Sequence, residues 1–276
     1  MTKQINWNPR WTRNRLEIWI ENIEWDWCIS RQRYHGVPIP VWYHKKTEEI
    51  ITPLENELPV DPRSDKLPQS IAEKYSSNDL IADNDILDTW ATSGCTPFGI
   101  AKIVKPNLQS KIFPNTLHPQ AIDNVTVWAF YCLVMSYYHF NKIPFKNVMT
   151  SGHGVDEKGG KISKRLGNFV DPYKLVDEYG ADAIRYWATG STLGKNHRFD
   201  LQEIIKGKHT ANKLWNAVRF VSIKLQEHLF KGIKYNSLNK KDIWILNQLK
   251  KTHSEVSDHL EKYEYANSSK KKKLKT

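Results

Sequence analysis

The sequence predicts a mixed α/β domain over residues 1–200 and a helical segment over residues 201–263. Two apolar stretches of strand length, residues 117–122 and 145–152, flank a longer apolar stretch that suits a helix ending near residue 140. Two strands joined by a crossover helix lie parallel in one sheet. Beyond residue 200 only helical periodicity recurs, so we place a domain boundary there.

The first elements are a helix and an extended segment. Leu16, Ile20 and Ile23 recur at helical spacing, so residues 13–23 are expected to form a helix. Residues 27–43 are apolar but contain two prolines, which favour loop and strand over helix.

Residues 44–85 are polar and rich in proline, and we expect a connector insertion with little regular structure. Residues 86–97 follow as a compact element that carries Trp and Thr residues. Asn124 or Thr126 is expected to cap the crossover helix, because short polar side chains accept hydrogen bonds from free backbone N–H groups.

A second helix start is marked by Asp171 followed by Pro172, and Gly180 is expected to end that helix before another begins near residue 181. The helical segment then carries one apolar stripe, made of Leu214, Val218, Val221, Leu225 and Leu229. Residues 241–263 are expected to form a further helix, and residues 264–276 a disordered basic tail.

Composition excludes several classes of protein. The formal net charge of +11 favours an anionic partner such as nucleic acid or phosphate. The longest apolar stretch, residues 125–138, is too short to cross a bilayer, and the start of the chain has no apolar signal core. The 3 cysteines lie far apart, which fits a reducing compartment. We therefore expect a cytoplasmic protein with no membrane partner.

A glycine-rich basic loop over residues 151–172 is the strongest candidate for chemistry. Lys161 and Lys164 can both face a polyphosphate if the loop is extended between them, and would neutralise charge that builds on an α-phosphate. His153 lies between two glycines, where a nucleotide can approach the backbone closely. A solvated basic surface loop is an equally open interpretation, and the segment is not a Walker A motif.

The segment Lys-Ile-Ser-Lys-Arg at residues 161–165 resembles the Lys-Met-Ser-Lys-Ser signature of class I aminoacyl-tRNA synthetases. Within the valyl, isoleucyl and leucyl branch, the blocks at residues 85–93 and 118–123 are most similar to the archaeal valyl type. Further blocks of this branch follow in family order, at residues 26–33, 38–43, 179–186 and 212–220. The resemblance implies the C-terminal half of a Rossmann-like catalytic domain, then the start of a helical anticodon-binding domain.

The resemblance implies roles for individual residues. Lys161 and Lys164 would be catalytic and would contact the phosphates of ATP together with Mg²⁺. Gly152, His153 and Ser163 would complete the ATP site. Asp88, Trp90 and Trp128 would border the amino-acid pocket, although a helix cap for Asp88 and core positions for both tryptophans remain open.

Two departures from the family pattern matter. The signature His-Ile-Gly-His is not found in these 276 residues, so we expect a fragment that is incompetent alone and has a complementary N-terminal synthetase chain as a possible partner. The Cys pairs that bind zinc in some relatives are also missing. Only His44 is available locally, so no zinc and no other protein-bound metal is predicted.

The implied reaction is ATP-dependent activation of valine to valyl-adenylate, followed by transfer to tRNA(Val). Isoleucyl and leucyl enzymes of the same branch are the first alternative. A non-catalytic remnant, or a subunit of a split synthetase that binds RNA or a partner chain, is the second. A general basic RNA-binding module ranks last, because the aromatic residues do not alternate with basic ones in an RRM or OB pattern.

Overall fold

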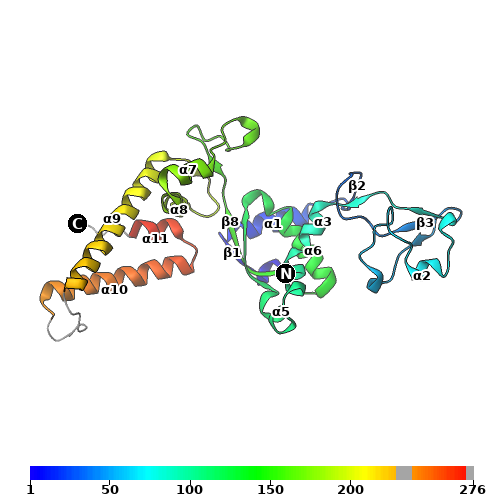
Figure 1. Cartoon of the computed structure of the whole chain (residues 1–276), viewed down its shortest axis with the longest axis horizontal. Coiled ribbons are helices and arrows are strands. Elements are labelled where there is room, and N and C mark those ends of the chain that lie inside the picture. Colours follow the sequence, from blue (N-terminus) through cyan, green and yellow to red (C-terminus); the bar gives the residue numbers. More distant parts are fainter. Residues whose placement is uncertain (228–237, 272–276) are drawn as a thin grey trace. The chain divides into compact units, whose positions relative to one another are not determined.

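The computed structural model describes residues 1–227 and 238–271 (Figure 1). The chain forms two compact units. The first comprises residues 1–6, 13–118 and 123–147, and the second comprises residues 7–12, 119–122 and 148–276. Within the described ranges, no helix is both long and apolar enough to cross a membrane.

The predicted strand–helix–strand unit is present. Strand β7 (Asn115–Ala121), helix α6 (Trp128–Phe140) and strand β8 (Phe145–Ser151) follow one another, and β8 is the middle strand of a sheet with the order β1-β8-β7. The backbone N–H of Asn115 donates to the carbonyl of Pro144 at one end of the pair, and the Ser151 hydroxyl donates to the carbonyl of Gln120 at the other. The two strands therefore run parallel, as predicted.

Helix α6 is held by one buried face, on which Ala129, Cys132, Leu133 and Ser136 recur at helical spacing. The predicted cap is wrong. The N-cap position is Val127, without a side-chain hydrogen bond, and Asn124 ends a short 3-10 helix (Ile122–Asn124) instead. The helix start therefore depends on packing of the apolar face rather than on capping.

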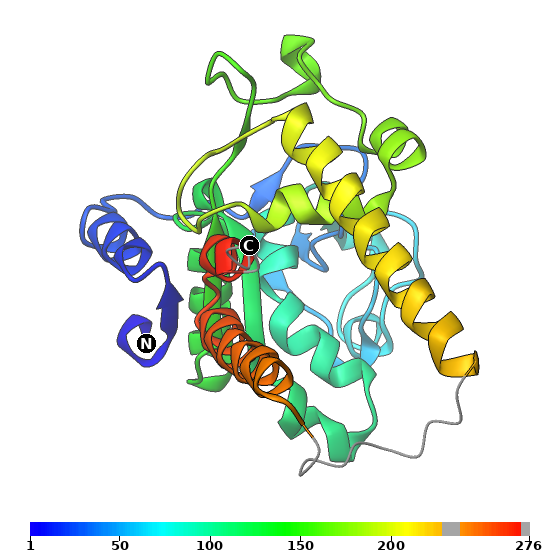
Figure 2. The ribbon, with the colours of Figure 1, turned by 90° about the vertical axis from the view of Figure 1, so that its left-hand side faces the viewer.

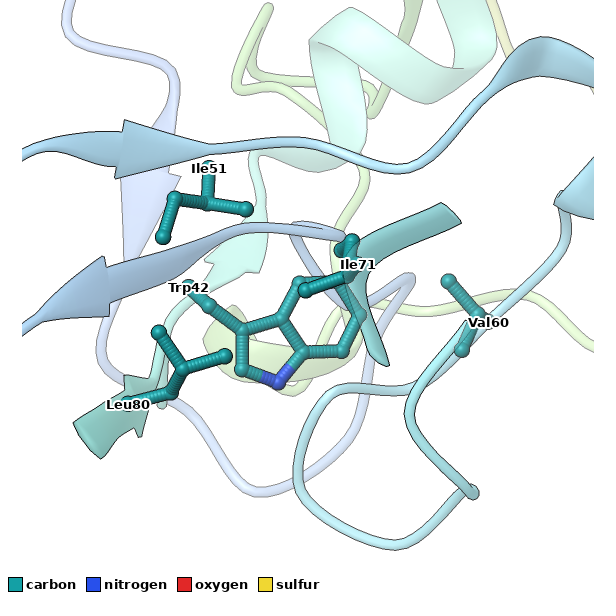
Figure 3. Close-up of a cluster of buried hydrophobic side chains, with 5 residues drawn as sticks. All are labelled: Trp42, Ile51, Val60, Ile71 and Leu80. Carbon is teal, nitrogen blue, oxygen red and sulfur yellow. The ribbon is translucent and has the colours of Figure 1, made fainter. Parts of the chain in front are cut away.

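Residues 44–85 also differ from the prediction, because they form part of a small ordered module. Strands β3 (Trp42–His44), β4 (Ile50–Ile51) and β5 (Leu80–Ala82) form an antiparallel sheet with the order β4-β3-β5. Helix α2 (Gln69–Ala72) completes a buried cluster made of Trp42, Ile51, Val60, Ile71 and Leu80 (Figure 3). These side chains are widely spaced in the sequence, so no local periodicity indicated them.

Helix α1 (Trp11–Glu21) is present as predicted, with Leu16 fully buried. The remaining elements before residue 115 are short. They are β1 (Asn6–Asn8), β2 (Ser30–Arg31), β6 (Ile86–Leu87), α3 (Thr89–Gly94), α4 (Thr96–Ile103), α5 (Pro106–Ile112) and the 3-10 helices Thr2–Gln4, Glu55–Glu57 and Ser77–Asp79.

Helices α7 (Pro172–Tyr179) and α8 (Ala181–Thr189) confirm the predicted cap and stop signals. The Asp171 carboxylate accepts a hydrogen bond from the backbone N–H of Tyr173, and Gly180 separates the helices with a φ of 87°. Within the basic loop, β9 (Gly154–Val155) pairs in parallel with β10 (His197–Arg198), which follows α8.

Two long helices follow, α9 (Leu201–Glu227) and α10 (Lys240–Glu261), and they lie apart along most of their length in both views (Figures 1 and 2). Of the predicted stripe, Leu229 lies outside the described residues, and the other four members are exposed. Helix α9 begins at Leu201, but the two compact units do not divide there, so the domain boundary stays a prediction.

The tail prediction is wrong for residues 265–271, which form helix α11 (Tyr265–Lys271). The Tyr265 hydroxyl donates to the sulfur of Met149 at 3.3 Å, the Ser269 hydroxyl bonds to that of Thr189 at 3.0 Å, and Ala266 is buried. Packing on β8 and α8 therefore orders a segment whose composition suggested disorder. Residues 272–276 lie outside the described residues.

Replacing Trp42 by Ala is expected to destabilise the 42–82 module by about 3–5 kcal/mol, because it empties the centre of the buried cluster. The measurement is urea unfolding followed by fluorescence and far-ultraviolet circular dichroism. Ile50→Ala on the same sheet is the control, since Ile50 is 67% exposed and its loss should cost less than about 1 kcal/mol. Equal losses for the two variants would contradict the assigned core.

Candidate functional site

The basic loop starts from the central strand β8 and is fixed by a close approach of two backbone segments. A Cβ atom added at Gly152 would lie 2.1 Å from the carbonyl oxygen of Lys195. The next residue, His153, donates its backbone N–H to the side-chain oxygen of Asn196 (3.1 Å), and its carbonyl accepts from the backbone N–H of His197 (2.8 Å). Glycine is therefore required at position 152 for β9 to pair with β10.

The signature loop, defined here as residues 156–168, is closed by one carboxylate and one amide. The Asp156 carboxylate accepts hydrogen bonds from the backbone N–H groups of Lys158 (3.0 Å) and Gly160 (2.8 Å). It also accepts from the Asn168 amide at 2.8 Å. These donors hold the pKa of Asp156 below its usual value, with the Asn168 hydrogen bond as the largest cause.

Asn168 also binds the middle of the loop. Its side-chain oxygen accepts from the backbone N–H of Ser163 at 2.9 Å, and its amide donates to the carbonyl of Lys161 at 3.2 Å. Gly167, with a φ of 72°, turns the chain so that the next residue can reach back. The loop is thus hydrogen-bonded across its width rather than left to solvent.

The two signature lysines are both exposed on this loop. Lys161 forms an antiparallel bridge with Val155, which extends the β9 edge, and Lys164 begins a 3-10 helix (Lys164–Leu166) capped by the hydroxyl of Ser163. The Lys164 ammonium group lies 5.1 Å from the centre of the Phe169 ring. Exposed, backbone-anchored ammonium groups can bind and stabilise phosphate charge.

All five residues predicted for the ATP site, namely Gly152, His153, Lys161, Ser163 and Lys164, therefore lie in one continuous stretch of the second unit. Their roles in ATP binding stay predictions. Sequence patterns did not single out Asp156 or Asn168. Their long-range hydrogen bonds carry no periodic signal in a single sequence.

In the first unit, aromatic side chains gather beside helix α3. The rings of Trp27 and Tyr131 stack with centroids 3.9 Å apart, and the Trp90 ring lies 6.3 Å from that of Tyr131. Trp90 remains 37% exposed, so one side of it is open to a ligand. A wall of this kind suits a small apolar side chain.

Asp88 is a structural residue in this group. Its side chain accepts from the backbone N–H of Trp90 at 2.9 Å and caps α3, and it also pairs with the Arg31 guanidinium and accepts from the indole of Trp27. The cap interpretation is confirmed. Binding of the amino acid by Asp88 stays a prediction, and these contacts fix the start of α3.

Trp128 lies deeper. Its indole donates to the carbonyl of Ser93 at 3.3 Å, and its ring lies 4.4 Å from that of His118, which stacks on Phe145 at 4.2 Å. Burial lowers the pKa of His118 to about 4. This packing favours the core interpretation of Trp128, while its place in an amino-acid pocket stays a prediction.

Among the described residues, no group of three or more His, Cys, Asp or Glu side chains could hold a metal ion. The residues that the structure describes therefore offer no built site for Mg²⁺, and we derive no step through that ion. The absence of zinc stays a prediction.

In the second unit Gln120 is buried, and within the described chain its side-chain amide has no hydrogen-bond partner, a feature that the sequence did not indicate.

The family profile described as "tRNA synthetases class I (I, L, M and V)" matches residues 1–200. Among curated proteins, the chain is similar to the valine–tRNA ligases of Wolbachia sp. subsp. Brugia malayi (40% identity, 95% of this chain) and Rickettsia felis (41%, 96%). It is also similar to that of Ehrlichia ruminantium (41%, 95%). The match covers 31–32% of these relatives, so the chain spans about a third of their length.

Among solved structures, the fold is similar to a ternary complex of Agrobacterium radiobacter LeuRS with tRNA and LeuAMS. The TM-score is 0.74 at 22% sequence identity, and the match covers 94% of this chain and 37% of the other. This likeness concerns the fold alone.

Gly152→Ala is expected to destabilise the second unit by about 2 kcal/mol or more, because the new Cβ would overlap the backbone at Lys195. The control is Gly154→Ala, whose Cβ would meet only the Ile162 side chain at 3.9 Å and should change stability by less than about 1 kcal/mol. Urea unfolding measures both. Matching effects would show that the close approach does not constrain the loop.

Stability is expected to decrease as the pH falls from 6.5 towards 4. Over this range His118 binds a proton in the unfolded chain but not when buried, since its folded pKa is about 4 against 6.5. The loss is on the order of 3 kcal/mol, complete near pH 4 and absent above pH 6.5. Unfolding free energies of wild type and His118→Phe across this range provide the measurement. The variant keeps the ring stack and should lose less stability; parallel curves would refute the assignment.

Proposed function

We propose, since the chain belongs to the family of class I tRNA synthetases (I, L, M and V), that it carries the ATP-phosphate loop and part of the amino-acid pocket of a valine–tRNA ligase. The observation that supports this most directly is the hydrogen-bonded loop with two exposed lysines, in a chain 40–41% identical to valine–tRNA ligases. The similarity to archaeal-type valyl enzymes is part of the same proposal.

In the proposed reaction the carboxylate of valine attacks the α-phosphate of ATP, which forms valyl-adenylate and releases pyrophosphate. Lys161 and Lys164 bind the phosphates and stabilise the charge that develops during displacement, with Lys164 as the main contributor. Gly152 and His153 lie where the adenine and ribose would approach the backbone. The ribose hydroxyl at the 3′ end of tRNA(Val) then attacks the acyl carbon.

The side chain of valine would lie against Trp90. Asp88 holds that residue by accepting its backbone N–H, and Trp128 supports the far end of α3 through Ser93. An apolar wall discriminates by only about 1–3 kcal/mol per methylene group. Isoleucine and leucine are therefore the competing substrates. Valine is favoured over them because the similar curated proteins are valine–tRNA ligases.

We further propose that residues 201–263 begin a helical anticodon-binding domain. The net charge of +11 supports tRNA as the partner. The exposed apolar residues of α9 and α10, such as Leu214 and Trp244, suit helices that are covered in a larger assembly. A complementary N-terminal chain would supply such an assembly; its addition is one arm of the test below.

Valine-dependent ATP–pyrophosphate exchange tests the proposed function. With an N-terminal synthetase half added, we expect exchange with valine and less than about a hundredth of it with isoleucine or leucine. Lys164→Ala should lower the rate about a hundredfold, since one phosphate-stabilising charge is lost. Lys158→Ala, in the same loop but outside the signature segment, should change the rate less than about threefold.

The assay is run on the 276-residue chain alone and with a separately expressed N-terminal synthetase half. Exchange that appears only on mixing supports a subunit of a split enzyme. Absence of valine-dependent exchange in both arms contradicts the proposal and favours an RNA- or partner-binding remnant. In that case, salt-dependent binding that does not distinguish tRNA(Val) from other RNA would identify a general RNA-binding module.

A further inference from the structure

The signature loop holds its two lysines by backbone contacts at successive residues. Four consecutive residues each have at least one backbone group bound: the N–H of Gly160 by the Asp156 side chain, the carbonyl of Lys161 by Asn168, the N–H of Ile162 by the carbonyl of Gly154 at 3.1 Å, and the N–H of Ser163 by Asn168. Three of these four contacts come from two side chains.

The Asn168 side chain is fully used. A carboxamide has one oxygen and two N–H donors, and here the oxygen binds Ser163 while the amide nitrogen donates to Asp156 and to the carbonyl of Lys161. Asp156 in turn accepts two backbone N–H groups of its own turn. The pair therefore ties both ends of the loop to its centre, which is the segment between the lysines.

These contacts matter for phosphate binding because a mobile loop loses backbone as well as side-chain conformational entropy when its lysines bind. A fixed backbone leaves only the side chains to be ordered. The carboxylate–amide contact is charge-assisted and stronger than a neutral hydrogen bond. An aspartate is ionised at neutral pH, and these hydrogen bonds lower the pKa of Asp156 further, so the charge-assisted contact is present under those conditions.

We infer that Asp156 and Asn168 are positioning residues that act through Lys161 and Lys164, by fixing the backbone on which these lysines are presented to the phosphates of ATP. The inference rests on the proposed function. Both side chains are engaged in hydrogen bonds within the loop, so in this inference they act by ordering its backbone rather than by binding the nucleotide.

The test compares Asn168→Ala and Asn168→Asp with Asn147→Ala. Asn168→Asp keeps the size and the acceptor for Ser163 but loses both donors. Asn147 likewise donates to a backbone carbonyl, that of Thr116, but lies outside the loop. Titration with ATP gives the Kd, and hydrogen exchange gives the opening of the Ser163 amide. Both Asn168 variants should weaken ATP binding and speed that exchange about tenfold, with the unfolding temperature little changed. The Asn147 variant should change neither.

A double-mutant cycle separates positioning from a general structural role. If Asn168 acts through the lysines, Asn168→Ala should weaken ATP binding less than threefold in a Lys164→Ala background. The same tenfold effect in both backgrounds, or unchanged Ser163 exchange, overturns the inference. A wild-type chain that binds no ATP even with the N-terminal synthetase half added contradicts the proposed function instead, and the exchange of the Ser163 amide then decides whether Asn168 holds the loop.

Discussion

The central place of β8 in its sheet is the constraint on which the candidate ATP site depends. Phe145, Val148 and Thr150 are buried along this strand, so its path is fixed by packing and by neighbours on both edges. The chain leaves β8 at Gly152, where only a glycine permits the backbone of residue 195 to approach. The direction in which the signature loop departs is therefore set before any loop residue contributes.

From that point the order of the loop comes from polar contacts rather than burial. Most residues of the loop are exposed, and Asp156 and Asn168 are only partly buried. Apolar packing cannot hold such a segment, because little area is removed from water. Hydrogen bonds from one ionised carboxylate and one amide replace it, and they leave the ammonium groups accessible. A solvated basic loop and a phosphate-binding loop can thus have the same composition. The order of the backbone distinguishes them.

Sequence patterns predicted those parts of the fold whose signals are local. The parallel unit, the cap at Asp171 and the stop at Gly180 depend on neighbouring residues, and the structure confirms them. The connector was mispredicted because its core joins Trp42 to residues up to 38 positions away, through prolines and polar stretches that resemble a loop (42 to 80). Helix α11 was missed for the same reason: its order comes from Tyr265 and Ser269 packing on distant elements.

The same distinction applies to the candidate site. The family resemblance supplied residue types and positions, and it could not separate a ligand-binding Asp88 from a cap, because either role is compatible with one carboxylate before a Trp. Lys164 shows what geometry adds. Its ammonium group rests over Phe169, a contact worth only about 0.5–1 kcal/mol at an exposed site. A charge-assisted contact with a phosphate is worth more. The lysine is therefore kept ordered near the loop by an interaction weak enough for an anion to displace.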